Sequence, residues 1–236
     1  VESVHPNGGD GLPAGHQITL AANLSQSTGT LRFGSEGLRI RLDRSGTNPV
    51  LGGTSLVVDL GDVAGRLSNS LPNAFDQVIH LGGLLGGPSA RIEGSNTAPV
   101  LGQSFQYTDT ISIGARNSDS EFAGVIADGT SANLPHITAI TKVGTGSLVL
   151  SGPNTYGGPT TVTEGVLVLM PAARSIVLDG PSGAVVDGGE LVFDYAGGSS
   201  PAAQVSALLM ASFSSVPAFS AGRSRRGQPT APHGPG

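Results

Sequence analysis

The chain alternates short apolar runs with turn-forming residues along most of its length. The runs are rich in Val, Ile, Leu and Thr, which favour strands, and Gly, Asn, Asp, Ser or Pro separate them. No helical pattern lies between them, which excludes alternating strand–helix units and predicts an all-β protein. The expected strands are Gln17–Leu24, Thr30–Phe33, Leu38–Asp43, Ser55–Leu60, Gln77–Leu81, Ala90–Glu93, Thr110–Ile113, Phe122–Ile126, Ile137–Thr141, Ser147–Leu150, Thr160–Thr163, Val166–Met170, Ser175–Leu178 and Glu190–Asp194.

The most regular pattern lies in residues 146–169, which read GSLVLSGPNTYGGPTTVTEGVLVL. The repeating positions are even up to Val162 and odd from Leu167. Because successive side chains of a strand point to opposite faces, this change of phase requires a bend. Gly165 suits the bend, since glycine adopts positive φ without a Cβ penalty. The opposite face is also apolar, which is consistent with stacked strands; it carries Val149, Val166 and Val168.

This segment resembles the autotransporter-associated β-strand repeat, found in the passenger regions of large exported bacterial proteins. The family pattern, roughly G-x-L-x-L-x-G-x-N-x-Y-x-G-x-T-x-V-x-x-G-x-L, is met at Gly146, Leu148, Leu150, Gly152, Asn154, Tyr156, Gly158, Thr160, Val162, Gly165 and Leu167. The preceding Thr141-Lys142-Val143-Gly144 resembles the family's lead-in. A weaker copy lies at Ile111–Gly114 and Phe122–Gly129.

The resemblance implies a right-handed parallel β-helix, in which stacked rungs of about 20–25 residues share one continuous core. Leu148, Leu150 and Leu167 are expected to line that core. Asn154 fits either a stacked amide ladder or an ordinary turn, and Tyr156 either an aromatic stack or a half-buried strand position. The expected organisation is divergent rungs in residues 1–104, the repeat region in 105–198, a capping helix in 199–213 and a disordered basic tail in 214–236.

The expected capping helix has its own local signals. Ser199-Ser200-Pro201 supplies a capping serine and a first-turn proline. The apolar stripe that follows has helical spacing; it consists of Val205, Leu208, Leu209 and Phe213. From residue 214 the composition cannot build a core, and three arginines make it basic. This tail is either native disordered sequence or a reading-frame artefact.

The amino-acid composition excludes further classes of protein and of binding partner. The chain of 236 residues has 37 Gly and 16 Pro, which disfavours a long helical bundle, and it has no cysteine, which excludes disulfides and thiolate metal sites. Its net charge of -5 argues against a nucleic-acid partner. No apolar run approaches a membrane-spanning helix, so direct membrane insertion is not expected. Neither a secretory signal nor a C-terminal barrel is recognisable, and we expect a segment of a larger passenger protein.

Candidate chemistry is sparse. The histidines have no partner at metal-ligand spacing; they are His5, His16, His80, His136 and His233. Asp59 and Asp62 form the closest acid pair, but a spacing of three places them on opposite faces of a strand. Residues 7–12 (NGGDGL) resemble one calcium-binding turn, and a single copy cannot form a site shared between turns. We expect no catalytic residue, no cofactor and no metal.

The sequence therefore favours a non-enzymatic structural or adhesive segment of a secreted or cell-surface passenger. The resemblance implies that it supports folding and export and presents surface regions. Its expected partners are a host or environmental surface, a polysaccharide, and the rest of the passenger, with outer-membrane association through flanking regions. One alternative is a β-helix polysaccharide lyase or hydrolase, which needs clustered acids and a base on one face. Another is a sugar-binding module, which the absence of Trp disfavours.

Overall fold

A computed structural model describes residues 17–20, 24–34, 39–42, 51–69, 76–95, 107–129, 136–170 and 183–194. These ranges contain strands and turns but no helix. The strands are β1 (Gln17–Leu20), β2 (Thr30–Arg32), β3 (Arg39–Leu42), β4 (Leu51–Asp59), β5 (Arg66–Asn69), β6 (Gln77–Leu85), β7 (Arg91–Glu93), β8 (Thr108–Ile113), β9 (Ser120–Phe122), β10 (Val125–Ala127), β11 (Ile137–Lys142), β12 (Ser147–Leu150), β13 (Thr160–Val162), β14 (Val166–Leu169), β15 (Ala184–Val186) and β16 (Glu190–Phe193). The expected strand at Ser175–Leu178, the capping helix at 199–213 and the tail at 214–236 lie outside the described residues.

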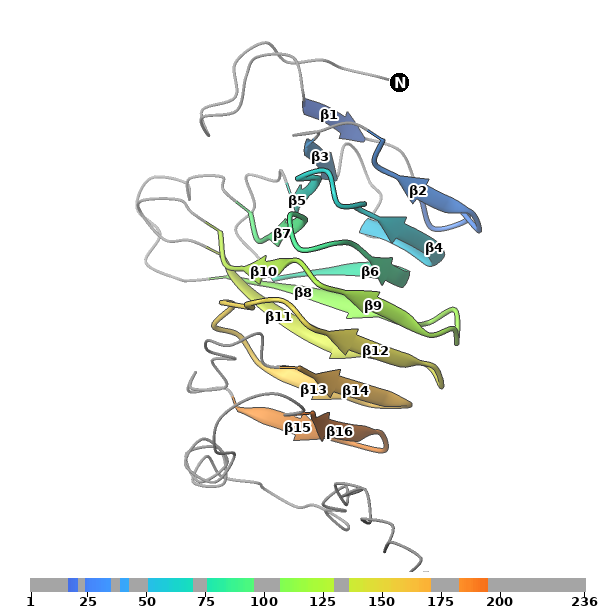
Figure 1. Cartoon of the computed structure of the whole chain (residues 1–236), viewed down its shortest axis with the longest axis vertical. Helices are drawn as coiled ribbons and strands as arrows, with labels where there is room; N and C mark the ends of the chain where they lie inside the picture. Colours follow the sequence, from blue (N-terminus) through green and yellow to red (C-terminus); the bar gives the residue numbers. More distant parts are fainter. Residues whose placement is uncertain are drawn as a thin grey trace, which may run out of the picture.

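The strands form three sheets, which we name sheets A, B and C. Their orders are β1-β3-β5-β7-β10, β2-β4-β6-β8-β11-β13-β15 and β9-β12-β14-β16. Every pairing between named strands is parallel. Figure 1 shows them stacked along the long axis in the order of the sequence. The prediction of all-β, parallel stacking is thus confirmed, and the arrangement is consistent with a β-solenoid.

One coil, meaning one passage of the chain through the sheets, is complete between β11 and β13. The chain leaves sheet B after β11 and adds β12 to sheet C. It then touches sheet A through the bridge from Thr155 to Ala127, and returns to sheet B as β13. Coil length varies along sheet B: the shortest coil brings Thr160 beside Ile140, and the longest brings Asp109 beside Gln77. The rung length expected from the sequence describes only the shorter coils.

The strand β6 covers the distance that two strands cover in the next coil. Its first part, Gln77–Leu81, pairs with β8, and the chain just after its last residue bridges to Phe122 of β9 through Gly86. In the next coil a turn at residues 114–119 separates β8 from β9. Residue 104 is where the sequence predicts the end of the divergent rungs. The sheets are continuous on both sides of it, because β6 and β8 pair directly.

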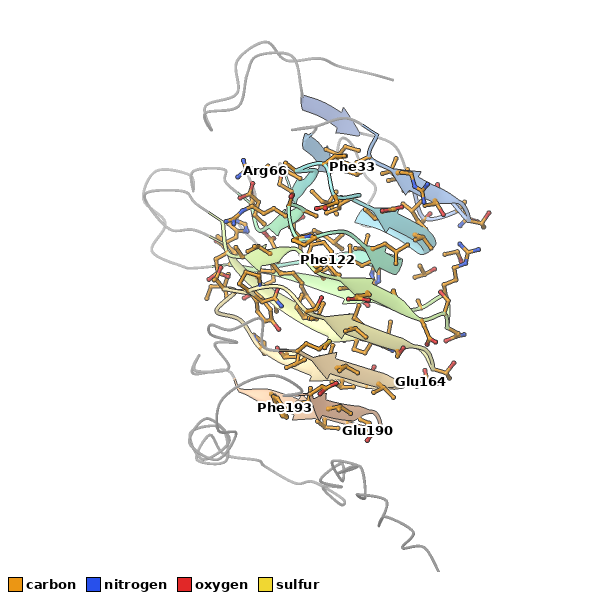
Figure 2. All side chains as sticks on the ribbon, viewed as in Figure 1. Phe33, Arg66, Phe122, Glu164, Glu190 and Phe193 are labelled. Carbon is orange, nitrogen blue, oxygen red and sulfur yellow. The ribbon has the colours of Figure 1, made fainter. Side chains whose placement is uncertain are left out.

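The core lies between the three sheets, and its buried residues run from Phe33 to Leu169. The expected lining residues Leu148, Leu150 and Leu167 are all 0% exposed. Phe33, which follows β2, and Phe122 are also buried, and Figure 2 shows Phe122 inside the middle of the stack. Each coil alone would leave its apolar face in water, so burial depends on the neighbouring coils.

Two parts of the strand prediction are wrong. The single strand expected at Phe122–Ile126 is two strands, β9 and β10, because the chain turns from sheet C to sheet A at Ala123-Gly124. A Cβ on Gly124 would overlap the Ala90 carbonyl, so the corner is tightly packed. The strands β5 and β15 were not expected. In β5 only Leu67 lies between polar residues, which is too short an alternation to indicate a strand.

Candidate functional site

Residues 140–169 form the complete coil and the strand that follows it, from the end of β11 to β14. The period of two predicted from the sequence is confirmed, since even positions from Leu148 to Val162 are buried apart from Gly158. Gly165 has φ of +66°, and after this bend Leu167 and Leu169 are 0% exposed. The bend therefore absorbs the change of phase and keeps the apolar side chains inside.

Glycines occupy the places where this coil approaches the preceding one. A Cβ on Gly146, Gly152 or Gly158 would overlap backbone carbonyl groups of the preceding coil. At Gly152 the overlap involves the carbonyl oxygens of Gly124 and Ala123, at the corner where the chain leaves sheet C. These positions need glycine because of close backbone contact between coils.

Asn154 and Tyr156 place polar atoms inside the same coil. Asn154 is 2% exposed, and its Oδ1 accepts a hydrogen bond of 3.0 Å from the Ile126 N–H of the preceding coil. The Tyr156 hydroxyl lies 2.9 Å from Thr160 Oγ1, and burial raises the pKa of Tyr156. Asn154 thus ties two coils through the backbone, and Tyr156 is held within its own coil.

Lys142, the only lysine of the chain, has an inward position that the sequence did not reveal. It pairs in register with Ile113 on one side and Val162 on the other, both 0% exposed, and is itself 1% exposed. Its Nζ donates to the carbonyl oxygens of Val143 at 2.8 Å, Gly144 at 2.6 Å and Glu164 at 3.2 Å. All three donors of the ammonium group therefore bind the turns of two successive coils. The position of Lys142 between two buried apolar residues can be recognised only when the pairing of the strands is known.

We expect Lys142→Met to reduce the free energy of unfolding by about 2 kcal/mol, because buried carbonyl groups lose their donor. Burial lowers the pKa of Lys142 below 10.5, against the opposing charges of Glu164 and Asp119. Between this lowered pKa and 10.5, the unfolded chain binds more protons than the folded chain, so stability rises with pH there. Urea unfolding at neutral and at alkaline pH should show this rise in the wild type relative to Lys142→Met. A pH-independent difference between the two proteins contradicts the prediction.

Acidic and amide side chains in the turns bind backbone N–H groups about one coil further along the chain. The oxygens of Asp62, Asp76, Asn117, Asp119 and Asp128 accept from Ser89, Thr108, Thr145, Ser147 and Gly157 respectively, at 2.8–3.1 Å. We call these contacts coil staples. Hydrogen bonds from Ser147 lower the pKa of Asp119 below 3.8. Four acidic residues of the chain therefore stabilise contacts between coils.

The two carboxylates singled out from the sequence have separate partners. Asp59 accepts from Arg32 Nε at 2.7 Å and from the Gly61 N–H at 2.9 Å, and its side chain is 13% exposed. Asp62 is exposed and accepts from the Ser89 N–H at 3.1 Å. Asp59 therefore stabilises its own turn and a contact with the preceding coil, and Asp62 stabilises a contact with the following coil.

His136 is a buried, hydrogen-bonded histidine. Its side chain is 4% exposed, with Nδ1 3.2 Å from Asp109 Oδ1, and Asp109 Oδ2 accepts from the Ser95 N–H at 2.7 Å. Its ring centroid lies 5.7 Å from that of Tyr107. This polar cluster joins the chain after β7 to β8 and to the residue just before β11, and sequence spacing did not indicate it.

The remaining candidates form no metal site in the part of the chain that the structure describes. There, no group of three or more His, Cys, Asp or Glu residues is placed to hold a metal ion. His80 lies on β6, while His5, His16, His233 and residues 7–12 lie outside the described ranges. Among the described residues, no helix is long and apolar enough to cross a membrane.

Comparison with known proteins gives one match, and it falls on the complete coil. The family model described as passenger-associated-transport-repeat matches residues 140–169. No curated protein matches the chain, and no solved structure does. The matched segment contains the buried even positions, Gly165 and Lys142. The match covers only this short segment of the chain, and it supports an association of the segment with the passenger regions of autotransporters.

Proposed function

We propose that the chain is a right-handed parallel β-helical segment of an autotransporter-like passenger, secreted or displayed at the cell surface. It is non-enzymatic: it supports folding and export, and it presents adhesive surface regions. The observation that carries this proposal is the coincidence of the family match with one complete coil that packs on both neighbours. A repeat that is also a structural coil is suited to building a rod.

The contacts that the polar side chains make support a scaffolding role. Lys142 binds only carbonyl oxygens, and the coil staples connect turns of adjacent coils. Asp59 and Asp62, the acids that a polysaccharide lyase or hydrolase would use, hold Arg32 and backbone N–H groups. These contacts stabilise the stack, which is what a stalk requires.

The proposal is tested by exporting the full chain between a secretion signal and an outer-membrane translocator. Surface exposure is measured by protease accessibility on intact cells, and folding by resistance of the released chain to limited proteolysis. We expect the wild type to reach the surface in a resistant form. Scrambling residues 140–169 at constant composition should reduce the resistant surface material strongly, because one coil can no longer pair with its neighbours.

The matched control is Val168→Thr, which changes an outward, half-buried position of β14 and keeps the core. It should behave like the wild type. Equal surface display and equal protease resistance of the scrambled chain would show that the repeat has no part in folding or export.

A further inference from the structure

The last two described strands leave part of the core half-buried at one end of the stack. Each of them pairs with one described strand, β15 with β13 in sheet B and β16 with β14 in sheet C. Ala184, Leu191 and Phe193 pack against the core cluster but are only partly buried. Figure 2 shows Phe193 at this end of the stack. We call the surface formed by Ala184, Val186, Leu191 and Phe193 the end face.

The strand register shows that the end face consists of core positions. Leu167, which is 0% exposed, pairs in register with Leu191 in sheet C. Val162, which is also 0% exposed, pairs with Val186 in sheet B. Leu191 and Val186 are half-buried because no further described coil lies on them. Solenoids need a cap at such an end, since an uncovered apolar end associates with other chains.

The sequence that follows β16 has the properties of a cap. Residues 195–213 lie outside the described part of the chain. Their sequence has an apolar stripe at helical spacing, and residues 199–213 (SSPAAQVSALLMASF) contain no charged side chain. A helix that lies on a protein surface usually carries charged residues on its polar face. The absence of charge therefore favours packing of this segment on an apolar surface.

The connection between β16 and this segment is short. The Asp194 N–H donates to the Leu169 carbonyl oxygen at 3.1 Å, so the chain is still attached to sheet C at this residue. Ser199 is five residues further on, a distance of at most about 18 Å along an extended chain. Packed sheets lie about 10 Å apart, and a helix over residues 199–213 is about 22 Å long. Such a helix can begin beside sheet C and extend over the end face.

We propose that the end face binds residues 199–213 of the same chain as a capping helix. The stripe formed by Val205, Leu208 and Leu209 packs on the inward side chains of β15 and β16. Both surfaces are apolar, and their contact removes them from water, which stabilises the last coil. This inference concerns the end of the stack and does not depend on the function proposed above.

The outer face of sheet C is a less suitable surface for the same segment. Glu121 and Glu190 lie on this face, where they pair with Val149 and Val166, and both are exposed. An uncharged helix packed there would remove water from two carboxylates without supplying a positive charge. The end face, in contrast, carries apolar side chains at all four of its positions.

The test measures the rate of thiol alkylation at single positions of the full chain, which has no cysteine of its own. Leu191→Cys places the thiol on the end face, and Val192→Cys places it on the outer face of the same strand. When Leu208→Asp and Leu209→Asp are added together, the thiol at position 191 should react roughly tenfold faster, because a charged stripe no longer packs over it. The thiol at position 192 should react at an unchanged rate.

The matched control is the pair Ala203→Asp and Ala207→Asp, which adds the same charge on the opposite side of the expected helix. It should leave both alkylation rates unchanged. Three results would overturn the inference: no acceleration at position 191 in the Leu208→Asp and Leu209→Asp chain, equal acceleration by both pairs of substitutions, or acceleration at position 192.

A second copy of the chain is the other possible occupant of the end face. In that case alkylation at position 191 would slow as the protein concentration rises, and the inference would be wrong. We expect the rate constant to be independent of protein concentration, since the cap belongs to the same chain. All of these substitutions lie outside residues 140–169, so failure of this test leaves the proposed role of the repeat intact.

Discussion

Leu150→Asp should unfold the coils around β12 and lower the free energy of unfolding by about 4 kcal/mol or more. Leu150 is 0% exposed and lies in register between Phe122 of β9 and Leu169 of β14, which are also 0% exposed. A carboxylate at this position has only apolar side chains beside it in the column, so its charge is not compensated. Thermal unfolding followed by circular dichroism measures the effect.

The control for this substitution is Val168→Asp on the adjacent strand β14. Val168 is half-buried, pairs with Val149 and Val192, and points away from the core because Leu167 and Leu169 point inward. Here the new carboxylate keeps access to water. The free energy of unfolding should therefore fall by only about 1 kcal/mol, within the range of strand propensities. A melting temperature of Leu150→Asp equal to that of Val168→Asp contradicts the inward position of Leu150.

Gly152→Ala should lower the free energy of unfolding by about 3 kcal/mol, although it adds only a methyl group. The added Cβ would overlap the backbone carbonyls of Gly124 and Ala123, and a backbone cannot move aside as a flexible side chain does. Urea unfolding measures the effect. The expected consequence is separation of two coils at the corner between sheets C and A.

Gly29→Ala is the comparison for this prediction. A Cβ on Gly29 has nothing within 4 Å, and Gly29 does not have positive φ. This substitution should be neutral, or stabilising by less than about 1 kcal/mol, because alanine reduces the entropy of the unfolded chain. If both alanine variants unfold at the same urea concentration, the close approach at Gly152 is not a constraint on the fold.

Local pattern was sufficient for the repeat coil. The sequence pattern has a period of two with a single change of phase. It predicts the alternation from Leu148 to Val162, the bend at Gly165 and the return of Leu167 to the core, and the structure has all three. These features depend on residues that are close together in the sequence. They can therefore be predicted without knowing which strands pair.

Features that depend on pairing between coils could not be predicted. Lys142 reads as an ordinary polar residue until its register places it between Ile113 and Val162. The bond from Asn154 to the Ile126 N–H and the contact of His136 with Asp109 join residues 28 and 27 positions apart. Because coil length differs from one coil to the next in sheet B, no fixed spacing in the sequence identifies such partners.

The variation in coil length has an evolutionary consequence, because it is concentrated in particular connections. The segment from sheet A back to sheet B spans residues 70–76 after β5, 94–107 after β7 and 128–136 after β10, while the strands it joins stay in register. Insertions and deletions at this edge can accumulate without disturbing the packed interior. Natural variants should therefore differ in length mainly in these connections.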